Sequence, residues 1–152
     1  MSESVGTLQD RSFERATAST AISYPPARRL SGAQLAAYLD GREYAVVGSA
    51  RPDGRPHAAM SVFIRRDTTF WLPTMAGSVR ERNLRGTPWL TMVIAEGDDG
   101  AHIAVLIEGP AETLTPDNVP ADVRAAYRGD WISAWIRLTA ERLLSYADEG
   151  AL

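Results

Sequence analysis

The amino-acid sequence predicts a mainly β fold, a small antiparallel barrel with a few short helices. Short runs rich in β-branched and aromatic residues follow one another from residue 44 onward, and turn sequences such as Asp53-Gly54 separate them. Helix-like patterns are confined to brief segments before and between these runs. Because an open sheet of five or six antiparallel strands would leave exposed edges, we expect the sheet to close.

The N-terminal part of the chain divides into two regions. Residues 1–22 show little periodicity, and we expect a flexible N-terminal arm before a single folded domain over residues 23–152. A short helix is expected to begin after Ser31, a suitable N-cap, and to end at Gly41. Its apolar stripe consists of Leu35, Tyr38 and Leu39.

The β-rich part begins with two hairpins in succession, which indicates an antiparallel meander. A short helix over residues 78–86 interrupts the strands, and a second capped helix is expected over residues 115–129. Pro110 within the longest apolar run predicts a bulge or an edge position. A short strand or turn is expected after the last strand. The expected strands cover residues 44–50, 57–66, 70–74, 89–96, 103–114 and 133–139.

Composition excludes several classes of protein. The 152 residues fit one domain, and a net charge of −3 gives no indication of a nucleic-acid partner. The chain has no cysteine, which excludes disulfides, thiolate metal sites and a cysteine nucleophile. No apolar run is long enough to cross a membrane, and the polar N-terminus lacks the apolar stretch of a secretory signal. We therefore expect a cytoplasmic protein without a membrane partner.

The segment "GSVRERNLRG" contains a cation in an unfavourable position. Ser78 and Glu81 have the spacing of a capping box, which places Arg80 in the first turn of a helix. A cation there is repelled by the helix dipole. Arg85 has Glu81 as a partner four residues earlier, whereas Arg80 has no acidic residue three or four positions on. Arg80 therefore either binds an anion such as phosphate, pairs with a distant carboxylate, or is simply solvated.

No constellation of catalytic side chains is evident. The two histidines, His57 and His102, lie far apart without zinc-ligand spacing, and we expect no metal site. Ser61 lacks the surroundings of a hydrolase nucleophile. His57 begins a strand, where it is either a proton donor or substrate contact, or a partly exposed strand residue.

Three stretches resemble a known family: "YAVVGSARPDGRPHAAMSVFI", "FWLPTMAGSVRERNLRGTPWLTMVI" and "IEGPAETL". In their order and spacing they are similar to the pyridoxamine 5′-phosphate oxidase-like superfamily of FMN-binding split barrels, which includes flavin and deazaflavin oxidoreductases. The resemblance covers roughly residues 30–146. It implies a six-stranded antiparallel split β-barrel, usually a homodimer with the cofactor between subunits.

The resemblance also implies a cofactor site. The family's basic residue on the short helix contacts the cofactor phosphate, and here it is Arg80, where Lys is common. The strand around Ala59 would lie against the cofactor ring, and Thr74 is a further candidate phosphate ligand. Trp131 and Trp135 would either stack in the cofactor cleft or pack in the core. The implied cofactor-binding residues are Ala59, Met60, Ser61, Val62, Leu72, Pro73, Thr74, Ser78, Arg80 and Asn83.

These features lead to a functional hypothesis. The chain would be an oxidoreductase that binds FMN or the deazaflavin coenzyme F420 and transfers hydride to or from a small organic substrate. The basic residues that bind substrate phosphate in true pyridoxamine phosphate oxidases are not evident, so we do not expect that substrate. Two alternatives remain open: a non-catalytic carrier of flavin, deazaflavin or haem, and a ligand-free interaction module.

Overall fold

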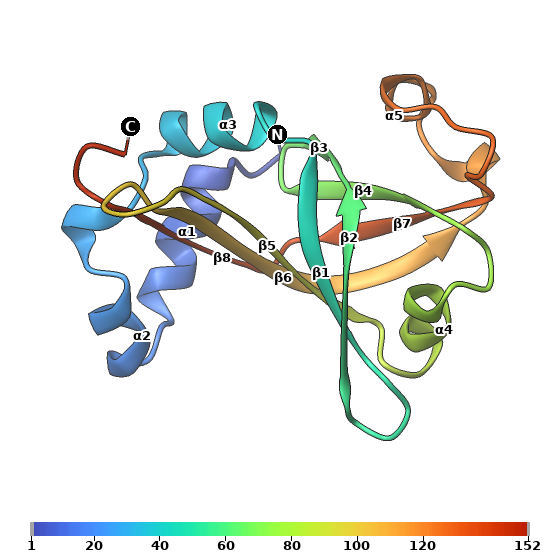
Figure 1. Cartoon of the computed structure of the whole chain (residues 1–152), viewed down its shortest axis with the longest axis horizontal. Coiled ribbons are helices and arrows are strands. Elements are labelled where there is room, and N and C mark those ends of the chain that lie inside the picture. Colours follow the sequence, from blue (N-terminus) through green and yellow to red (C-terminus); the bar gives the residue numbers. More distant parts are fainter. Residues whose placement is uncertain (1, 152) are drawn as a thin grey trace.

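Eight strand segments form one antiparallel sheet in the computed structural model, which describes residues 2–151 (Figure 1). The strand order is β2-β1-β5-β6-β7-β4-β3, and β8 also pairs with β6. The strands are β1 (Tyr44–Ala50), β2 (Pro56–Val62), β3 (Ile64–Arg66), β4 (Thr69–Thr74), β5 (Trp89–Glu96), β6 (Ile103–Leu114), β7 (Ala134–Thr139) and β8 (Arg142–Ala147).

The eight segments are six continuous runs of chain. Only Phe63 separates β2 from β3, and only two residues separate β7 from β8. Because β2 pairs with β1 while β3 pairs with β4, the two ends of the sheet path belong to one run, and the sheet closes on itself. The fold is therefore mainly β, and the expected six-stranded split barrel is confirmed.

The longest strand, β6, changes partner at Gly109 and Pro110. Residues before this point pair with β8, and residues after it pair with β7, with a shift of one residue in the register. A Cβ atom on Gly109 would lie 2.0 Å from the Thr139 carbonyl oxygen, so only glycine fits this crossing. The irregularity expected from Pro110 is thus confirmed as the point where the sheet bends.

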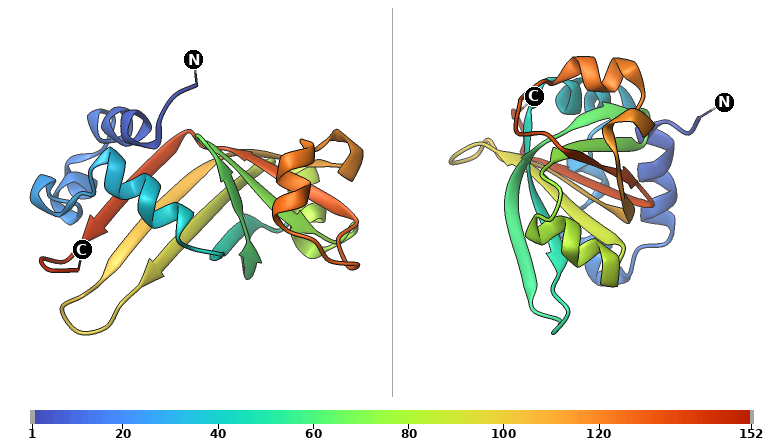
Figure 2. Two further views of the ribbon diagram at one scale, coloured as in Figure 1. Left: turned by 90° about the horizontal axis from the view of Figure 1, so that it is seen from above. Right: turned by 90° about the vertical axis from the view of Figure 1, so that its right-hand side faces the viewer.

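The helices lie mainly at the two ends of the sheet. The first three helices gather at one end, and α4 and α5 lie at the other (Figures 1 and 2). None of the described helices is long and apolar enough to cross a membrane. The helices are α1 (Val5–Glu14), α2 (Ala18–Ser23), α3 (Gly32–Asp40), α4 (Val79–Gly86) and α5 (Ala121–Ala126), with 3₁₀ turns at Pro26–Arg28 and Pro116–Asn118.

The hydrophobic residues form two clusters. The main cluster fills the barrel and includes Val47, Phe70 and Met92. A smaller cluster lies beneath α5 and joins Val123 to Trp135. Strand β4 contributes to both clusters, because its alternate side chains point to opposite faces. Strand β4 is therefore packed against a hydrophobic cluster on each of its two faces.

Part of the flexible arm expected over residues 1–22 is instead the helix α1, Val5–Glu14, which packs against the barrel. Ser4 caps α1, and Val5 and Leu8 are buried in the same main cluster as the barrel residues. The Ser12 hydroxyl accepts a hydrogen bond from the Leu143 N–H at 3.0 Å, which covers the free edge of β8. The helix was missed because its buried face includes polar residues, so the apolar periodicity is weak. Met1, also part of the expected arm, lies outside the described residues.

Two further helix predictions have different outcomes. The helix after Ser31 is confirmed, with a capping box completed by Gln34. The expected helix over residues 115–129 is instead a 3₁₀ turn followed by the short α5, which begins after Pro120 without a side-chain cap. Pro120 lacks an N–H and disfavours helical backbone in the residue before it, which explains the interruption.

Candidate anion site at the start of helix α4

Helix α4 lies across one end of the barrel, against β1 and β6. Its Leu84 side chain enters the main cluster, which fixes the helix against the sheet. Gly77 has a φ of 80°, which turns the chain from β4 into the helix. The Ser78 hydroxyl accepts a hydrogen bond from the Glu81 N–H at 3.3 Å. The reciprocal half of the capping box is absent, because the Glu81 carboxylate binds Arg85 instead.

Arg80 is a partly buried cation without a counter-charge among residues 2–151. Its Nη2 atom lies 3.5 Å from the Thr74 hydroxyl, which in turn lies 3.2 Å from the Ser78 hydroxyl. Its Nε atom is buried and has no hydrogen-bond partner in the described chain. Burial lowers the pKa of the Arg80 guanidinium below its usual value, and no nearby carboxylate opposes this shift. The sequence left open that Arg80 pairs with a distant carboxylate. No such carboxylate partner is present among residues 2–151.

The backbone adds donors at the same point. The Arg82 N–H bonds the Ser78 carbonyl at 2.9 Å and begins the intrahelical ladder. Helix geometry leaves the N–H groups of Val79 and Arg80 without intrahelical acceptors. Two hydroxyls, two backbone N–H groups and a guanidinium thus surround the start of α4. This set is rich in donors and positively charged, which is the chemistry that binds phosphate.

Asn83 connects the helix to the barrel. Its Nδ2 atom donates a hydrogen bond to the Ser49 hydroxyl on β1 at 3.0 Å, and both side chains are buried. Arg80 and Asn83 are three residues apart and lie on the same helix face. No sequence pattern pointed to Ser49, because its contact with Asn83 depends on how α4 packs against β1.

The β2 residues of the expected site divide between two faces. Ala59 and Ser61 lie on the face that pairs with the inward residues of β1, and the Ser61 hydroxyl donates to the Val62 carbonyl. Met60 points to the opposite face and is 63% exposed. Val62 shares the face of Met60 but is buried in the smaller cluster. The structure therefore brings Ala59 and Ser61 toward the inner side of the barrel, and it does not bring Met60 there.

The β4 residues also differ from one another. Thr74, at the end of the strand, is buried and contacts both Ser78 and Arg80. Leu72 is fully buried in the main cluster, so its side chain supports the strand and lines no surface. Pro73 is buried opposite Trp135 on β7.

The tryptophans of the tail have different environments. Trp135 is buried in the smaller cluster and packs as a core residue. Trp131 is 46% exposed and meets the Tyr127 ring edge-on at 6.3 Å.

Among the described residues, no group of three or more His, Asp or Glu side chains is arranged to hold a metal ion.

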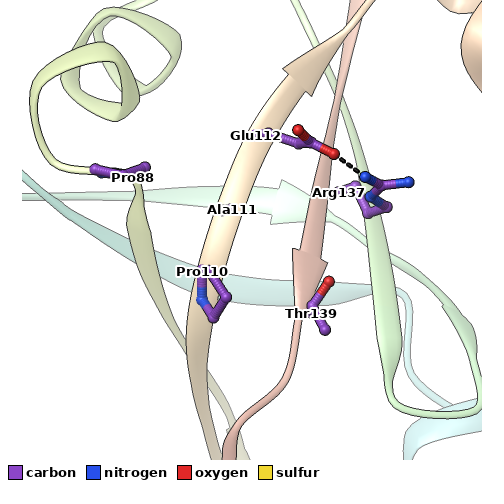
Figure 3. Close-up of a pocket in the computed structure, with 6 residues that line it drawn as sticks. All are labelled: Pro88, Pro110, Ala111, Glu112, Arg137 and Thr139. Atoms are coloured by element: carbon purple, nitrogen blue, oxygen red, sulfur yellow. Dashed lines mark hydrogen bonds and ion pairs between the residues drawn. The ribbon is translucent and has the colours of Figure 1, made fainter.

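A surface hollow of about 290 Å³ lies between Pro88 and the strands β6 and β7 (Figure 3). Its two charged residues, Glu112 and Arg137, form an ion pair with each other. Since these charges are already matched, the hollow offers no unpaired group to a ligand. Arg80 is a stronger candidate for ligand binding than this hollow.

The sequence matches the family model for pyridoxamine 5′-phosphate oxidase over residues 31–147. This match includes every element of the barrel and the whole of α4. The chain belongs to this family. No curated protein sequence matches the chain significantly.

Solved structures of the family confirm the fold. A conserved hypothetical protein from Mycobacterium tuberculosis is 23% identical, with a TM-score of 0.70 over 82% of this chain and 89% of that one. An FAD-binding protein from Mycobacterium smegmatis is 16% identical, with a TM-score of 0.64 over 80% and 98%. A haem storage protein from Vibrio cholerae is 12% identical, with a TM-score of 0.60 over 79% and 97%.

Proposed function

We propose that this member of the family binds the phosphate of FMN or coenzyme F420 at the start of α4 and acts as a cytoplasmic oxidoreductase on a small organic substrate. The observation that carries the proposal is the partly buried guanidinium of Arg80, which has no counter-charge among residues 2–151 and whose Nε atom has no hydrogen-bond partner there. Burying a cation without a partner costs free energy, and a bound phosphate would supply the missing charge and acceptors. The FAD-binding relative from Mycobacterium smegmatis supports a flavin-type ligand.

Each group around Arg80 has a role in this proposal. The guanidinium and the N–H groups of Val79 and Arg80 would hold the phosphate oxygens. The hydroxyls of Thr74 and Ser78 would donate further hydrogen bonds to them, because each can rotate its proton toward an acceptor. Their positions are fixed by the buried end of β4 and by the helix cap.

The inner face of β2 would support the ring system. The small side chain of Ala59 leaves space for a planar group, and Ser61 offers a hydroxyl near it. Flavins and deazaflavins supply hydride transfer themselves, so the chain needs to bind and orient the ring and to exclude water. The lack of an obvious acid–base pair in the sequence agrees with this division of roles.

The proposal is tested by titrating FMN and F420 into the protein and following fluorescence. Arg80→Ala should weaken binding of the preferred cofactor roughly 10- to 150-fold, as expected for loss of a charge-assisted contact of about 1.5–3 kcal/mol. Arg82→Ala is the matched control, because Arg82 lies on the same helix but is exposed. Equal affinities of the two variants, or no binding of either cofactor by the wild type, would refute the site.

We further propose that the chain forms a homodimer through the outer face of β1 and β2. Tyr44, Val46 and Met60 are exposed on this face, and Val46 lies opposite Met60 in the register. Val93 of β5 extends the apolar face on the other side of Val46. A contiguous exposed apolar surface of this kind is typical of a protein interface.

Light scattering after size-exclusion chromatography tests this assembly. Wild-type protein should have the mass of a dimer, and Met60→Glu should shift it to a monomer by burying a charge in the interface. Ile22→Glu is the control, because Ile22 is 80% exposed on α2, away from this face. A monomeric wild type would exclude the proposed interface.

The alternative of a carrier is supported by the haem storage protein from Vibrio cholerae. An oxidoreductase would transfer hydride between its bound cofactor and a small substrate over many turnovers. A carrier would bind its ligand and show no turnover. Titration with haem, run beside FMN and F420, would identify which class of ligand this chain prefers.

A further inference from the structure

His57 is a partly buried residue with a hydrogen-bonding ring nitrogen that the proposed site does not yet use. It lies on β2, directly opposite Ser49 of β1 in the register. Its Nδ1 atom is buried and has no hydrogen-bond partner in the part of the chain that the structure describes. Because alternate residues of a strand share a face, His57 lies on the same side of β2 as Ala59 and Ser61. It therefore lies on the inner side of the hairpin.

Helix α4 approaches the same place from the other side. Asn83 binds Ser49, the cross-strand neighbour of His57. Arg80 precedes Asn83 by three residues, which is about 4.5 Å along the helix axis, and it lies on the same helix face. A row of polar side chains thus runs from Thr74 and Arg80 through Asn83 and Ser49 to His57.

Two nitrogen atoms in this row, Nε of Arg80 and Nδ1 of His57, have no hydrogen-bond partner among residues 2–151. The guanidinium can only donate hydrogen bonds, so whatever completes it must be an acceptor. The Nδ1 atom of an imidazole can also donate. A phosphate group offers several acceptor oxygens, and different oxygens can bind donors on opposite sides of it. A phosphate bound between α4 and the β1–β2 hairpin would offer an acceptor to each of these two atoms.

We propose that His57 is a second hydrogen-bond donor to the cofactor phosphate, opposite Arg80. This inference rests on the proposed function. In the proposed function, α4 and the end of β4 bind the phosphate. The inference adds the β1–β2 hairpin as a third element that contacts it. His57 would bind and orient the cofactor in this role and would not serve as the catalytic acid.

The chain has only two histidines, which makes a direct test possible. Proton NMR of the ligand-free protein should show two sets of imidazole signals, and His102→Gln assigns them. Adding FMN should shift the His57 signals and leave those of His102 in place. Riboflavin, which has the same ring without the phosphate, should leave both in place. If F420 is the preferred ligand, F420 replaces FMN and its phosphate-free chromophore replaces riboflavin in this experiment.

Affinity measurements give an independent readout. His57→Gln should weaken FMN binding by about 5- to 10-fold, and should leave riboflavin binding unchanged. His102→Gln is the matched control and should bind FMN like the wild type. His102 directly precedes β6 and pairs with Asp148, so it lies outside the proposed site.

The possible results separate the inference from the proposed function. If FMN binds while the His57 signals stay in place, or if riboflavin shifts them equally, His57 is not a phosphate donor and the proposed function stands. If neither FMN nor F420 binds, the proposed function fails and this inference fails with it.

Discussion

The Nδ2 atom of Asn83 lies 3.0 Å from the Ser49 hydroxyl, and this hydrogen bond joins helix α4 to strand β1. Both side chains are buried, so the bond is shielded from water. The family resemblance placed Asn83 among the cofactor-binding residues, and in the structure its amide donates to Ser49 of the barrel. Asn83 therefore sets the separation between α4 and the β1–β2 hairpin, and so the width of the candidate site.

Asn83→Ala should lower the free energy of unfolding by about 1–3 kcal/mol, because it leaves the buried Ser49 hydroxyl without its partner. Urea unfolding measures this change. Asn118→Ala is the control, since Asn118 is exposed and bonds only Thr115 locally. Equal losses in the two variants would show that the contact between α4 and β1 contributes little.

Arg80→Met should stabilise the ligand-free protein or leave its stability unchanged. The substitution removes a buried cation that has no counter-charge and retains much of the apolar stem. Thermal unfolding without cofactor should therefore show an equal or higher Tm, while cofactor affinity falls. Arg82→Met, on the exposed side of α4, should change neither the Tm nor the cofactor affinity. A large loss of stability in Arg80→Met would mean that the arginine has a structural role.

Gly109→Ala should destabilise the barrel by at least about 2 kcal/mol. The new methyl group would lie 2.0 Å from the Thr139 carbonyl oxygen, and the rigid sheet cannot readily move there. Gly86→Ala is the matched control, because a Cβ atom at Gly86 has no neighbour within 4 Å. It should leave stability unchanged or raise it by less than about 1 kcal/mol. Chemical denaturation of both variants tests the difference.

Ser12→Ala should weaken the attachment of α1 to the barrel. It removes the acceptor of the Leu143 N–H, whose burial makes the loss cost about 1–3 kcal/mol. Ser23→Ala is the control. Ser23 donates to the Ser19 carbonyl as Ser12 donates to the Leu8 carbonyl, but Ser23 is exposed. Hydrogen exchange at Leu143 gives a local readout. An unchanged exchange rate there would indicate that α1 does not protect the edge of β8.

Asp148 should make stability depend on acid pH. Hydrogen bonds from the His102 N–H and the Tyr146 hydroxyl lower the pKa of its carboxyl group in the folded state. A lowered folded pKa stabilises the protein above the unfolded pKa of about 3.9, and the contribution is lost as pH falls below it.

Asp148→Asn should therefore reduce stability at pH 7 and approach the wild type below about pH 4. Urea titrations at several pH values measure this difference. Asp10→Asn, on the exposed face of α1, serves as the control. A difference between wild type and Asp148→Asn that does not shrink as the pH falls below about 4 would contradict the assignment.

Local patterns predicted much of this fold. Ser31 and Gly41 bound α3 as expected, and the strands followed the alternating apolar runs. The first helix was missed, because Gln9 and Ser12 are polar residues buried by hydrogen bonds to distant parts of the chain. The extent of α5 was also wrong, since two prolines limit it. These differences arise where tertiary contacts or backbone restrictions outweigh side-chain periodicity.

The sequence by itself determined the order of the strands along the chain, the start of α4 and the unusual position of Arg80. Each depends on residues within a few positions of one another, where caps, turns and the helix dipole act. Only the tertiary structure decided that Arg80 is partly buried with no carboxylate partner among residues 2–151, that Asn83 faces Ser49, and that His57 lies opposite that serine. These are contacts between segments far apart in the chain, and they follow from sheet register and helix packing.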